Sequence, residues 1–166
     1  AGTIVWAAGV TANPLAKLLG GELGRGGRII VDADLSVPAH PEIWAIGDIA
    51  LSPTYDGTPL PQVAQPAIQG GRHVAAQILR RVEGRPTEPF VYKDKGSMAT
   101  IGRNQAGVEL ANGWRFHGLV GWVAWLGLHL VYLLGFRNRA NVLVNWAWNY
   151  LTYDHGARII VEHPER

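Results

Sequence analysis

The 166-residue sequence contains no cysteine. A chain without thiols has no disulfide framework, no thiolate zinc site, no iron–sulfur cluster and no redox-active cysteine pair. Methionine occurs once, as Met98, and the chain opens inside an apolar run. We therefore expect it to be a piece of a longer protein.

Dense charge is also lacking, because the net charge is only +2 and the three lysines and twelve arginines are dispersed. Arg80 and Arg81 with Arg85 come nearest to a basic run, and this pattern is typical of the C-terminal end of a helix, where cations suit the dipole. We therefore predict no nucleic-acid partner. The six histidines show no metal-ligand spacing on a shared helix, so no metal is assigned.

The most informative segment joins a strand end to a helix start. An apolar run at residues 43–46 leads into Gly47 and Asp48, and residues 64–69 (AQPAIQ) follow after a loop. Glycine lets the backbone approach a pyrophosphate closely, and a carboxylate accepts hydrogen bonds from sugar-like hydroxyls. The pattern therefore suits a nucleotide cofactor.

Further elements follow from periodicity and from helix-ending residues. Residues 3–10 (TIVWAAGV) predict a strand buried on both faces, and residues 62–82 predict a helix that ends before Gly84 and Pro86. Shorter elements are expected as a helical turn at residues 13–19 and strands at residues 28–31, 90–92, 97–101 and 105–110.

Two further segments are interpreted as turns. The glycine-dense residues 20–27 suggest a phosphate cradle, but they neither follow a strand directly nor open a helix, so a flexible turn is favoured. Asp32 and Asp34 lack a third metal ligand, and we read them as solvated turn residues.

The C-terminal third changes character. Residues 118–136 carry no formal charge, close to the roughly 20 residues that a transmembrane helix needs. Arg137 and Arg139 follow at once, and residues 141–153 form an amphipathic pattern. These features predict two apolar helices joined by an arginine-containing turn.

Aromatic residues in the first of these helices fall on one stripe, formed by Trp122, Trp125, His129 and Tyr132. Tryptophan and tyrosine favour the headgroup level of a bilayer. The pattern favours a helix pair that lies in the membrane interface or makes a dimer contact, over packing as core and over a true span. We interpret His129 as a packed residue without a catalytic role.

The order of segments resembles the C-terminal portion of the type II NADH dehydrogenases, which are single-subunit flavoprotein NADH:quinone oxidoreductases. Four stretches carry this likeness: residues 3–14 (TIVWAAGVTANP), 42–48 (EIWAIGD), 61–69 (PQVAQPAIQ) and 92–102 (YKDKGSMATIG). The second and third are the most specific, since they match the second flavin motif and the glutamine-bearing helix start beside flavin and quinone.

The resemblance implies an α/β fold, as the C-terminal part of a two-dinucleotide-binding-domain flavoprotein (FAD/NAD(P)-binding, Rossmann-like) with a helical membrane-associating hairpin. The implied divisions are the end of the NADH-binding domain at residues 1–12, FAD-binding domain at 13–90, antiparallel strands at 91–112 and the helical tail at 113–166.

The resemblance also implies roles for individual residues. The expected FAD-binding set is Gly9, Gly47, Asp48, Ala64 and Gln65, and the expected quinone-binding set is Gln65, Gln69 and Lys95. Within them, Gly47 approaches the pyrophosphate, Asp48 accepts bonds from the ribityl hydroxyls, and the amides at the helix start face the flavin ring. A helix N-terminus favours the negative charge of reduced flavin. No catalytic side chain is assigned.

The implied reaction passes electrons from NADH through FAD to a membrane quinone, with the protein peripheral on the cytoplasmic face of the membrane. No G-x-G-x-x-G segment opens a helix here, so we expect the isolated chain to bind neither cofactor well and to be inactive. Two alternatives are a non-catalytic membrane-anchoring or dimerisation module and another FAD-dependent pyridine nucleotide reductase. Whether the protein forms a homodimer through its tail is left open.

Overall fold

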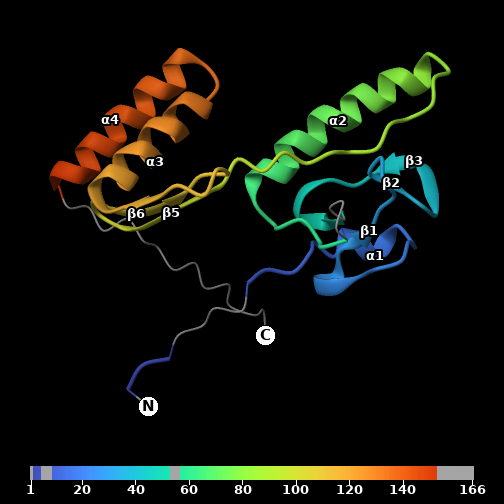
Figure 1. Ribbon diagram of the computed structural model, residues 1–166, viewed down its shortest axis with the longest axis horizontal. Coiled ribbons are helices and arrows are strands. Elements are labelled where there is room, and N and C mark those ends of the chain that lie inside the picture. Colours follow the sequence, from blue (N-terminus) through green and yellow to red (C-terminus); the bar gives the residue numbers. More distant parts are fainter. Residues whose placement is uncertain (1, 5–8, 53–56, 153–166) are drawn as a thin grey trace, which may run out of the picture. The chain divides into compact units, whose positions relative to one another are not determined.

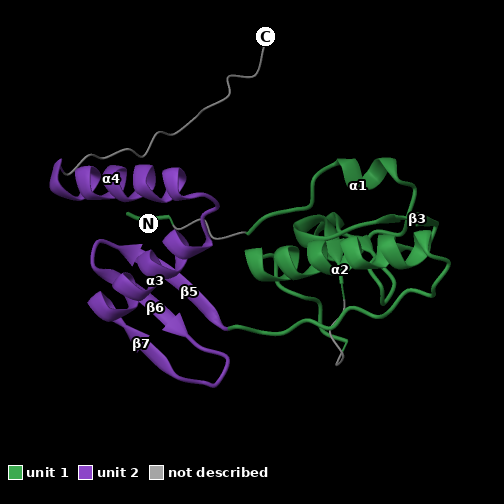
Figure 2. Ribbon diagram, turned by 90° about the horizontal axis from the view of Figure 1, so that it is seen from above, with its two compact units in different colours: residues 1–95 green, residues 96–166 purple. Residues whose placement is uncertain are grey.

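The computed structural model describes residues 2–4, 9–52 and 57–152, and it divides the chain into two compact units. Figure 2 colours these units, which are Ala1–Lys95 and Gly96–Arg166. Each unit is α/β in content, and each is built around its own small sheet or sheets.

Unit 1 combines two short strand pairs with one long helix (Figure 1). Its elements are α1 (Leu15–Leu18), η1 (Arg25–Gly27), β1 (Ile29–Ile30), β2 (Ser36–Val37), β3 (His40–Trp44), η2 (Gly47–Ile49), β4 (Ala50–Leu51) and α2 (Ala64–Val82). Strands β1 and β4 pair in parallel, and β2 and β3 pair antiparallel with a shift in register between Ser36 and Val37.

The core of unit 1 lies between these strands and α2. Ile29 and Val37 are fully buried, and Leu35 is nearly so. Val74 of α2 and Phe90 of the following segment pack against this cluster. Because these apolar side chains leave water together, they supply most of the force that closes the unit.

Helix α2 begins and ends much as its sequence predicts. Pro66 lies in the first turn, where its missing N–H has no intrahelical partner to lose. The last turn carries Arg80 and Arg81, and Gly84 follows in the left-handed region with a φ of 71°. The helix thus starts two residues later than expected and ends at the expected residue.

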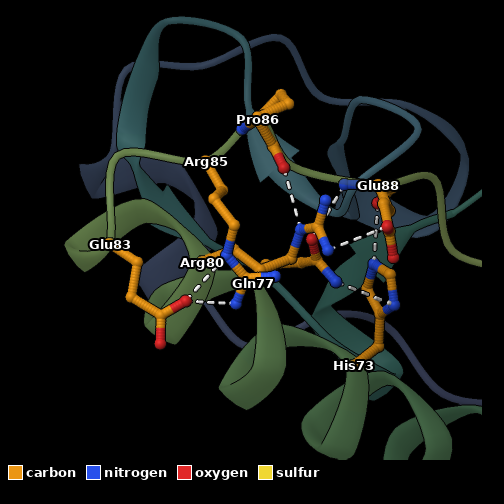
Figure 3. A network of polar contacts seen from close by, with 7 residues as sticks. All are labelled: His73, Gln77, Arg80, Glu83, Arg85, Pro86 and Glu88. Atoms are coloured by element: carbon orange, nitrogen blue, oxygen red, sulfur yellow. Dashed lines mark hydrogen bonds and ion pairs between the residues drawn. The ribbon is translucent and has the colours of Figure 1, made fainter.

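The segment after α2 returns along the helix and is held by helix side chains (Figure 3). The buried Gln77 accepts a hydrogen bond from the Glu88 backbone N–H at 2.8 Å, and His73 Nε2 lies 3.0 Å from the Glu88 carbonyl oxygen. Arg80 donates to the Pro86 carbonyl at 2.8 Å and pairs with the Glu88 carboxylate at 2.9 Å. Residues 86–90 are therefore fixed without any strand pairing.

Three predictions for unit 1 need correction. Residues 90–92 form no strand: Phe90 makes a backbone bond to Ala33 and places its ring in the core. Strand β3 ends at Trp44 instead of Ile46 and lies in an antiparallel pair. The strand expected at residues 3–10 falls partly on residues 5–8, outside the described part, and the described Thr3, Ile4, Gly9 and Val10 belong to no strand.

Unit 2 is an antiparallel sheet with helix α3 packed on it and helix α4 packed on α3 (Figure 1). Its elements are β5 (Ser97–Gly102), β6 (Gln105–Glu109), β7 (Arg115–His117), α3 (Gly118–Tyr132) and α4 (Phe136–Thr152). The predicted pair of strands β5 and β6 is confirmed, whereas β7 is an addition that the sequence did not suggest. Helix α3 packs on β6, with buried Gly121 against Ala106.

Helices α3 and α4 pack through aromatic side chains. Trp122 lies 5.7 Å from Tyr150 between ring centroids, and Trp125 lies 6.0 Å from Trp146. These two tryptophans of the predicted stripe therefore face α4. Within the described ranges, no helix is both long and apolar enough to cross a membrane.

The arginines expected in the turn between the helices lie instead in the first part of α4, because the turn itself is formed by residues 133–135. Arg139 donates from Nε to the Leu133 carbonyl at 2.9 Å and from Nη2 to the Val131 carbonyl at 2.8 Å. A cation at these carbonyls satisfies the C-terminal end of α3 and favours its dipole.

Candidate functional site

The strand end predicted to face a cofactor packs against the start of α2. Gly47 opens η2 with a φ of 68°, a backbone conformation that L side chains rarely adopt. A Cβ at this position would lie 3.0 Å from the Cβ of Ala67. The sequence therefore uses glycine here for its conformation and for its close approach to the helix.

The first turn of α2 offers backbone donors at this place. Val63 is the N-cap, in an extended conformation and without a side-chain cap, and no acidic residue occupies the first turn. The N–H groups of Ala64 and Gln65 thus carry the positive end of a 19-residue helix. Gln62 donates its side-chain amide to the Asp48 carbonyl at 3.1 Å, which holds this helix start to η2.

Asp48 is exposed beside the buried guanidinium of Arg28. Burial, above all, lowers the pKa of Arg28, and the positive charge of Arg25 lowers it further, whereas the negative charge of Asp48 raises it. Arg28 also donates from Nη1 to the Leu60 carbonyl at 3.0 Å. The carboxylate expected to accept hydroxyl hydrogen bonds therefore stays accessible next to a cation.

The predicted quinone-binding residues are brought together only in part. Gln69 is held by the backbone of Lys93: its amide donates to the Lys93 carbonyl at 2.9 Å and accepts from the Lys93 N–H at 3.1 Å. Gln65 lies one turn away, with its Oε1 3.5 Å from Gln69 Nε2. The lysine that contacts Gln69 is therefore Lys93, through its backbone. Lys95 is exposed and is the last residue of unit 1.

Gly9 lies on a cleft of unit 1 with a volume of about 480 Å³. The described residues that line this cleft are Gly9, Val10, Thr11, Arg25, Gly26, Arg28, Pro59, Leu60, Pro61 and Gln62. Through Gln62 the cleft adjoins Asp48 and the start of α2. Of the residues expected to bind FAD, Gly9 thus lines the cleft itself, and Asp48 is joined to it through Gln62.

The apolar tail contains a separate cavity of about 630 Å³ within unit 2. Its walls come mainly from α3 and α4 and include Trp122, Trp125 and Trp146. His129 stacks on Trp125 with 4.0 Å between ring centroids, and its Nδ1 lies 2.8 Å from the Trp125 carbonyl oxygen. His129 is thus held against Trp125 of its own helix, and its side chain is exposed.

Some residues of this region escaped the sequence analysis. Arg28 was read only as a strand residue, although an arginine directly before a fully apolar run was a signal that its charge must be accommodated. Gln62 was placed inside the helix, whereas it lies before the N-cap and reaches back to Asp48. Among the described residues, no cluster of acidic and histidine side chains has the form of a metal site.

The first part of the chain is similar to a known protein family. Residues 1–71 match the family model of the pyridine nucleotide-disulphide oxidoreductases. Because the chain has no cysteine, it cannot supply the thiols for disulphide chemistry.

Curated relatives extend the match over nearly the whole chain. A type II NADH:quinone oxidoreductase, NdhA, of Mycobacterium tuberculosis is 42% identical over 165 residues, which cover 94% of this chain and 34% of that protein. The internal alternative NAD(P)H-ubiquinone oxidoreductase A1 of Arabidopsis thaliana mitochondria is 33% identical, covering 90% and 33%. A type II NADH:quinone oxidoreductase of Staphylococcus saprophyticus is 39% identical over 103 residues, covering 61% and 25%. The chain thus spans about a third of the length of the first relatives.

Proposed function

On the premise that this chain is a homologue of the type II NADH:quinone oxidoreductases, of which it spans about a third, we propose that it is part of an FAD-dependent enzyme that passes electrons from NADH to a quinone. The proposal rests on one observation in particular: Gly47 and Asp48 are held against the uncapped start of α2. This contact brings together the two segments that carry the resemblance to the flavin motifs.

The residues present fit one flavin. In this proposal Asp48 accepts hydrogen bonds from the ribityl hydroxyls, and the N–H groups of Ala64 and Gln65 face the pyrimidine edge of the flavin ring, with Gly9 and Gly47 close to the cofactor. FAD, when bound, supplies the electron transfer between NADH and quinone, and the protein supplies placement and polarity. The positive end of α2 favours the negative charge that reduction leaves on the ring.

For the quinone site we propose Gln65, Gln69 and Lys95, with Gln65 as the amide donor. The two bonds between Gln69 and Lys93 occupy the Gln69 amide, so Gln65 is the better placed of the two. Gln69 then holds residue 93 beside α2 and orients Gln65.

A membrane location suits this reaction because quinones dissolve in the bilayer. We propose that unit 2 lies on the cytoplasmic face of the membrane, where NADH is available, and that it also provides a homodimer contact. Several apolar side chains of unit 2 support a lipid-facing role by their exposure, among them Leu119, Val120, Val131, Leu134, Phe136 and Trp148. Exposed apolar side chains in this number are typical of a surface that contacts a membrane or a partner.

The test is a polypeptide of the relatives' full length that carries this chain as its matching third. We expect it to purify with a yellow flavin, one per chain, and to oxidise NADH when a short-chain quinone is added. A colourless protein that still binds liposomes would refute the enzyme and support a membrane-anchoring module. Flavin with NADH turnover but no quinone reduction would instead support another pyridine nucleotide reductase.

A further inference from the structure

We propose that the cleft lined by Arg25 and Arg28 binds a phosphoanhydride, and that its occupant is the pyrophosphate of the dinucleotide cofactor. This inference rests on the proposed function, since it names cationic partners for the FAD that Gly47 and Asp48 are proposed to hold. Neither arginine has a role in the motifs from which that function was argued.

The cleft has the size and walls for a phosphate-bearing ligand. Its volume is about 480 Å³, and Gly9 and Gly26 lie on it. A Cβ on either glycine would meet open space, so no side chain stands between this backbone and a ligand. Gly26 belongs to the glycine-dense segment that was interpreted as a flexible turn. In the fold, Gly26 of that turn and residues 59–62 line the same cleft.

Arg28 brings a buried positive charge to the cleft. The residue as a whole is only 7% exposed, and the bond to the Leu60 carbonyl uses one of the five N–H donors of the guanidinium. A buried cation is costly unless an opposite charge accompanies it. Asp48 provides part of that charge from an exposed position.

Arg25 adds a second cation close to the first. The two guanidinium groups are near enough that Arg25 lowers the pKa of Arg28, and both line the cleft. Among the described residues, the charges that shift the pKa of Arg28 are those of Arg25 and Asp48, so two cations face one carboxylate in this part of the structure. A ligand with two negative charges would neutralise that surplus, and the planar fork of arginine matches phosphate oxygens in pairs.

FAD and NADH both contain a pyrophosphate, and the neighbours of the cleft favour FAD. Gln62 lines the cleft and bonds to Asp48, so the same cavity wall leads directly to the carboxylate proposed for the ribityl chain. The ribityl chain and the pyrophosphate are adjacent in FAD. NADH has no ribityl chain for Asp48 to hold.

The inference can be tested on the 166-residue chain, with inorganic pyrophosphate as the probe. We expect one pyrophosphate per chain by calorimetry, with shifts of the Arg25 and Arg28 Nε–H signals in nitrogen-15 NMR spectra. Arg25→Gln changes an exposed side chain and should weaken binding about tenfold, the value of one charge-assisted hydrogen bond. Arg28→Lys keeps the charge but loses the fork, and should weaken binding by a similar factor.

Arg85→Gln is the matched control, because it also removes one exposed arginine from unit 1, one that pairs with Glu83 outside the cleft. Equal weakening by Arg85→Gln and Arg25→Gln would show non-specific attraction and overturn the inference, as would binding without shifts at Arg25 and Arg28. Should Arg28→Lys fail to fold, the Arg25→Gln variant and the unmodified chain still decide the question.

A second arm separates this inference from the proposed function, using the full-length polypeptide and its FAD affinity. If it binds FAD and reduces quinone, and Arg25→Gln leaves the FAD affinity unchanged, the inference is wrong and the function stands. If the chain binds pyrophosphate through both arginines but the full-length polypeptide holds no flavin, the phosphate cleft stands. In that case the FAD assignment is wrong.

Discussion

The backbone of Gly47 packs on Ala67 so closely that a Cβ at residue 47 would lie 3.0 Å from the Ala67 Cβ and 3.7 Å from its Cα. This contact joins η2 to the beginning of α2. It also coincides with a φ of 68° at Gly47. Both the conformation and the space at this position therefore require glycine.

Gly47→Ala should destabilise unit 1 by about 2 kcal/mol. The left-handed conformation costs about 1 kcal/mol or more for alanine, and the new methyl group must displace η2 from α2. Urea unfolding followed by hydrogen exchange of the amides of Ile29 and Ala50 would measure this loss within unit 1.

Gly84→Ala provides the control, because Gly84 has a similar φ of 71° but open space around its missing Cβ. It should cost only the conformational part, about 1 kcal/mol. In a double-mutant cycle, Ala67→Gly should cost less stability in the Gly47→Ala variant than in the unmodified chain. The reason is that removing the Ala67 methyl group relieves the clash with the new Cβ at residue 47. Equal costs for Gly47→Ala and Gly84→Ala would mean that the contact with Ala67 carries no energy.

Gly121→Ala should loosen α3 from the sheet of unit 2. A Cβ at Gly121 would lie 2.7 Å from the carbonyl oxygen of Ala106, and that atom belongs to the backbone of a paired strand, so it cannot move aside. We expect a loss of about 1–3 kcal/mol, typical of overpacking. Thermal unfolding followed by tryptophan fluorescence reports on this unit.

Gly127→Ala lies in the same helix with open space at its Cβ. It should stabilise α3 by about 0.5–1 kcal/mol, because alanine loses less backbone entropy than glycine. The two substitutions are therefore expected to change the unfolding temperature in opposite directions. Stabilisation by both would show that α3 does not pack on β6 as described.

The parts of the fold that the sequence predicts are those governed by local signals. Helix α2 has glycine and proline beyond its end, and the pair of strands β5 and β6 is joined by a turn at residues 102–105, so both were expected. The strand predicted at residues 90–92 fails because its first residue, Phe90, fills the core from a segment that Gln77 and Arg80 hold in place. Such side-chain to backbone bonds leave no periodic pattern.

The candidate site shows the same division. Gly47 and Asp48 were predicted because glycine and a carboxylate after an apolar run form a recognisable motif. Arg28 and Gln62 act through contacts with Leu60 and Asp48, residues 32 and 14 positions away in the chain. No local spacing encodes a contact of that kind.

Asp34 should make unit 1 sensitive to acid. Burial, the largest single influence, raises the pKa of Asp34, but the hydrogen bonds from Ser36 and Thr87 outweigh it, so the pKa lies below its ordinary value. The Ser36 hydroxyl donates at 2.6 Å and its N–H at 3.0 Å. A carboxyl whose folded pKa is lowered stabilises the protein above its unfolded pKa of about 3.9, and this stability is lost as pH falls through the folded pKa.

Ser36→Ala removes the hydroxyl donor and should therefore cost more stability at pH 6 than at pH 2.5, as measured by urea unfolding at both values. Asp32→Asn, at an exposed carboxylate two residues earlier, serves as the control for general charge effects. A cost of Ser36→Ala that does not change with pH would show that the bond to Asp34 does not depend on its charge.

Asp48→Asn tests the cofactor assignment at the residue on which it depends most. Asparagine has nearly the same shape, and the bond from Gln62 goes to the backbone carbonyl of residue 48, so the chain should keep its fold and lose only the attraction between Asp48 and Arg28. A charged acceptor forms stronger hydrogen bonds with hydroxyl groups than a neutral amide does. In the full-length polypeptide we expect FAD affinity to fall by about tenfold or more, measured by the fluorescence of released flavin.

Glu42→Gln is the control, because it removes an exposed carboxylate from the neighbouring strand β3 and should leave FAD bound as before. If both variants retain FAD equally, the carboxylate of Asp48 does not hold the ribityl chain. The exposed position of Asp48 beside Arg28 would then need a purely electrostatic explanation, namely that Asp48 compensates a buried cation.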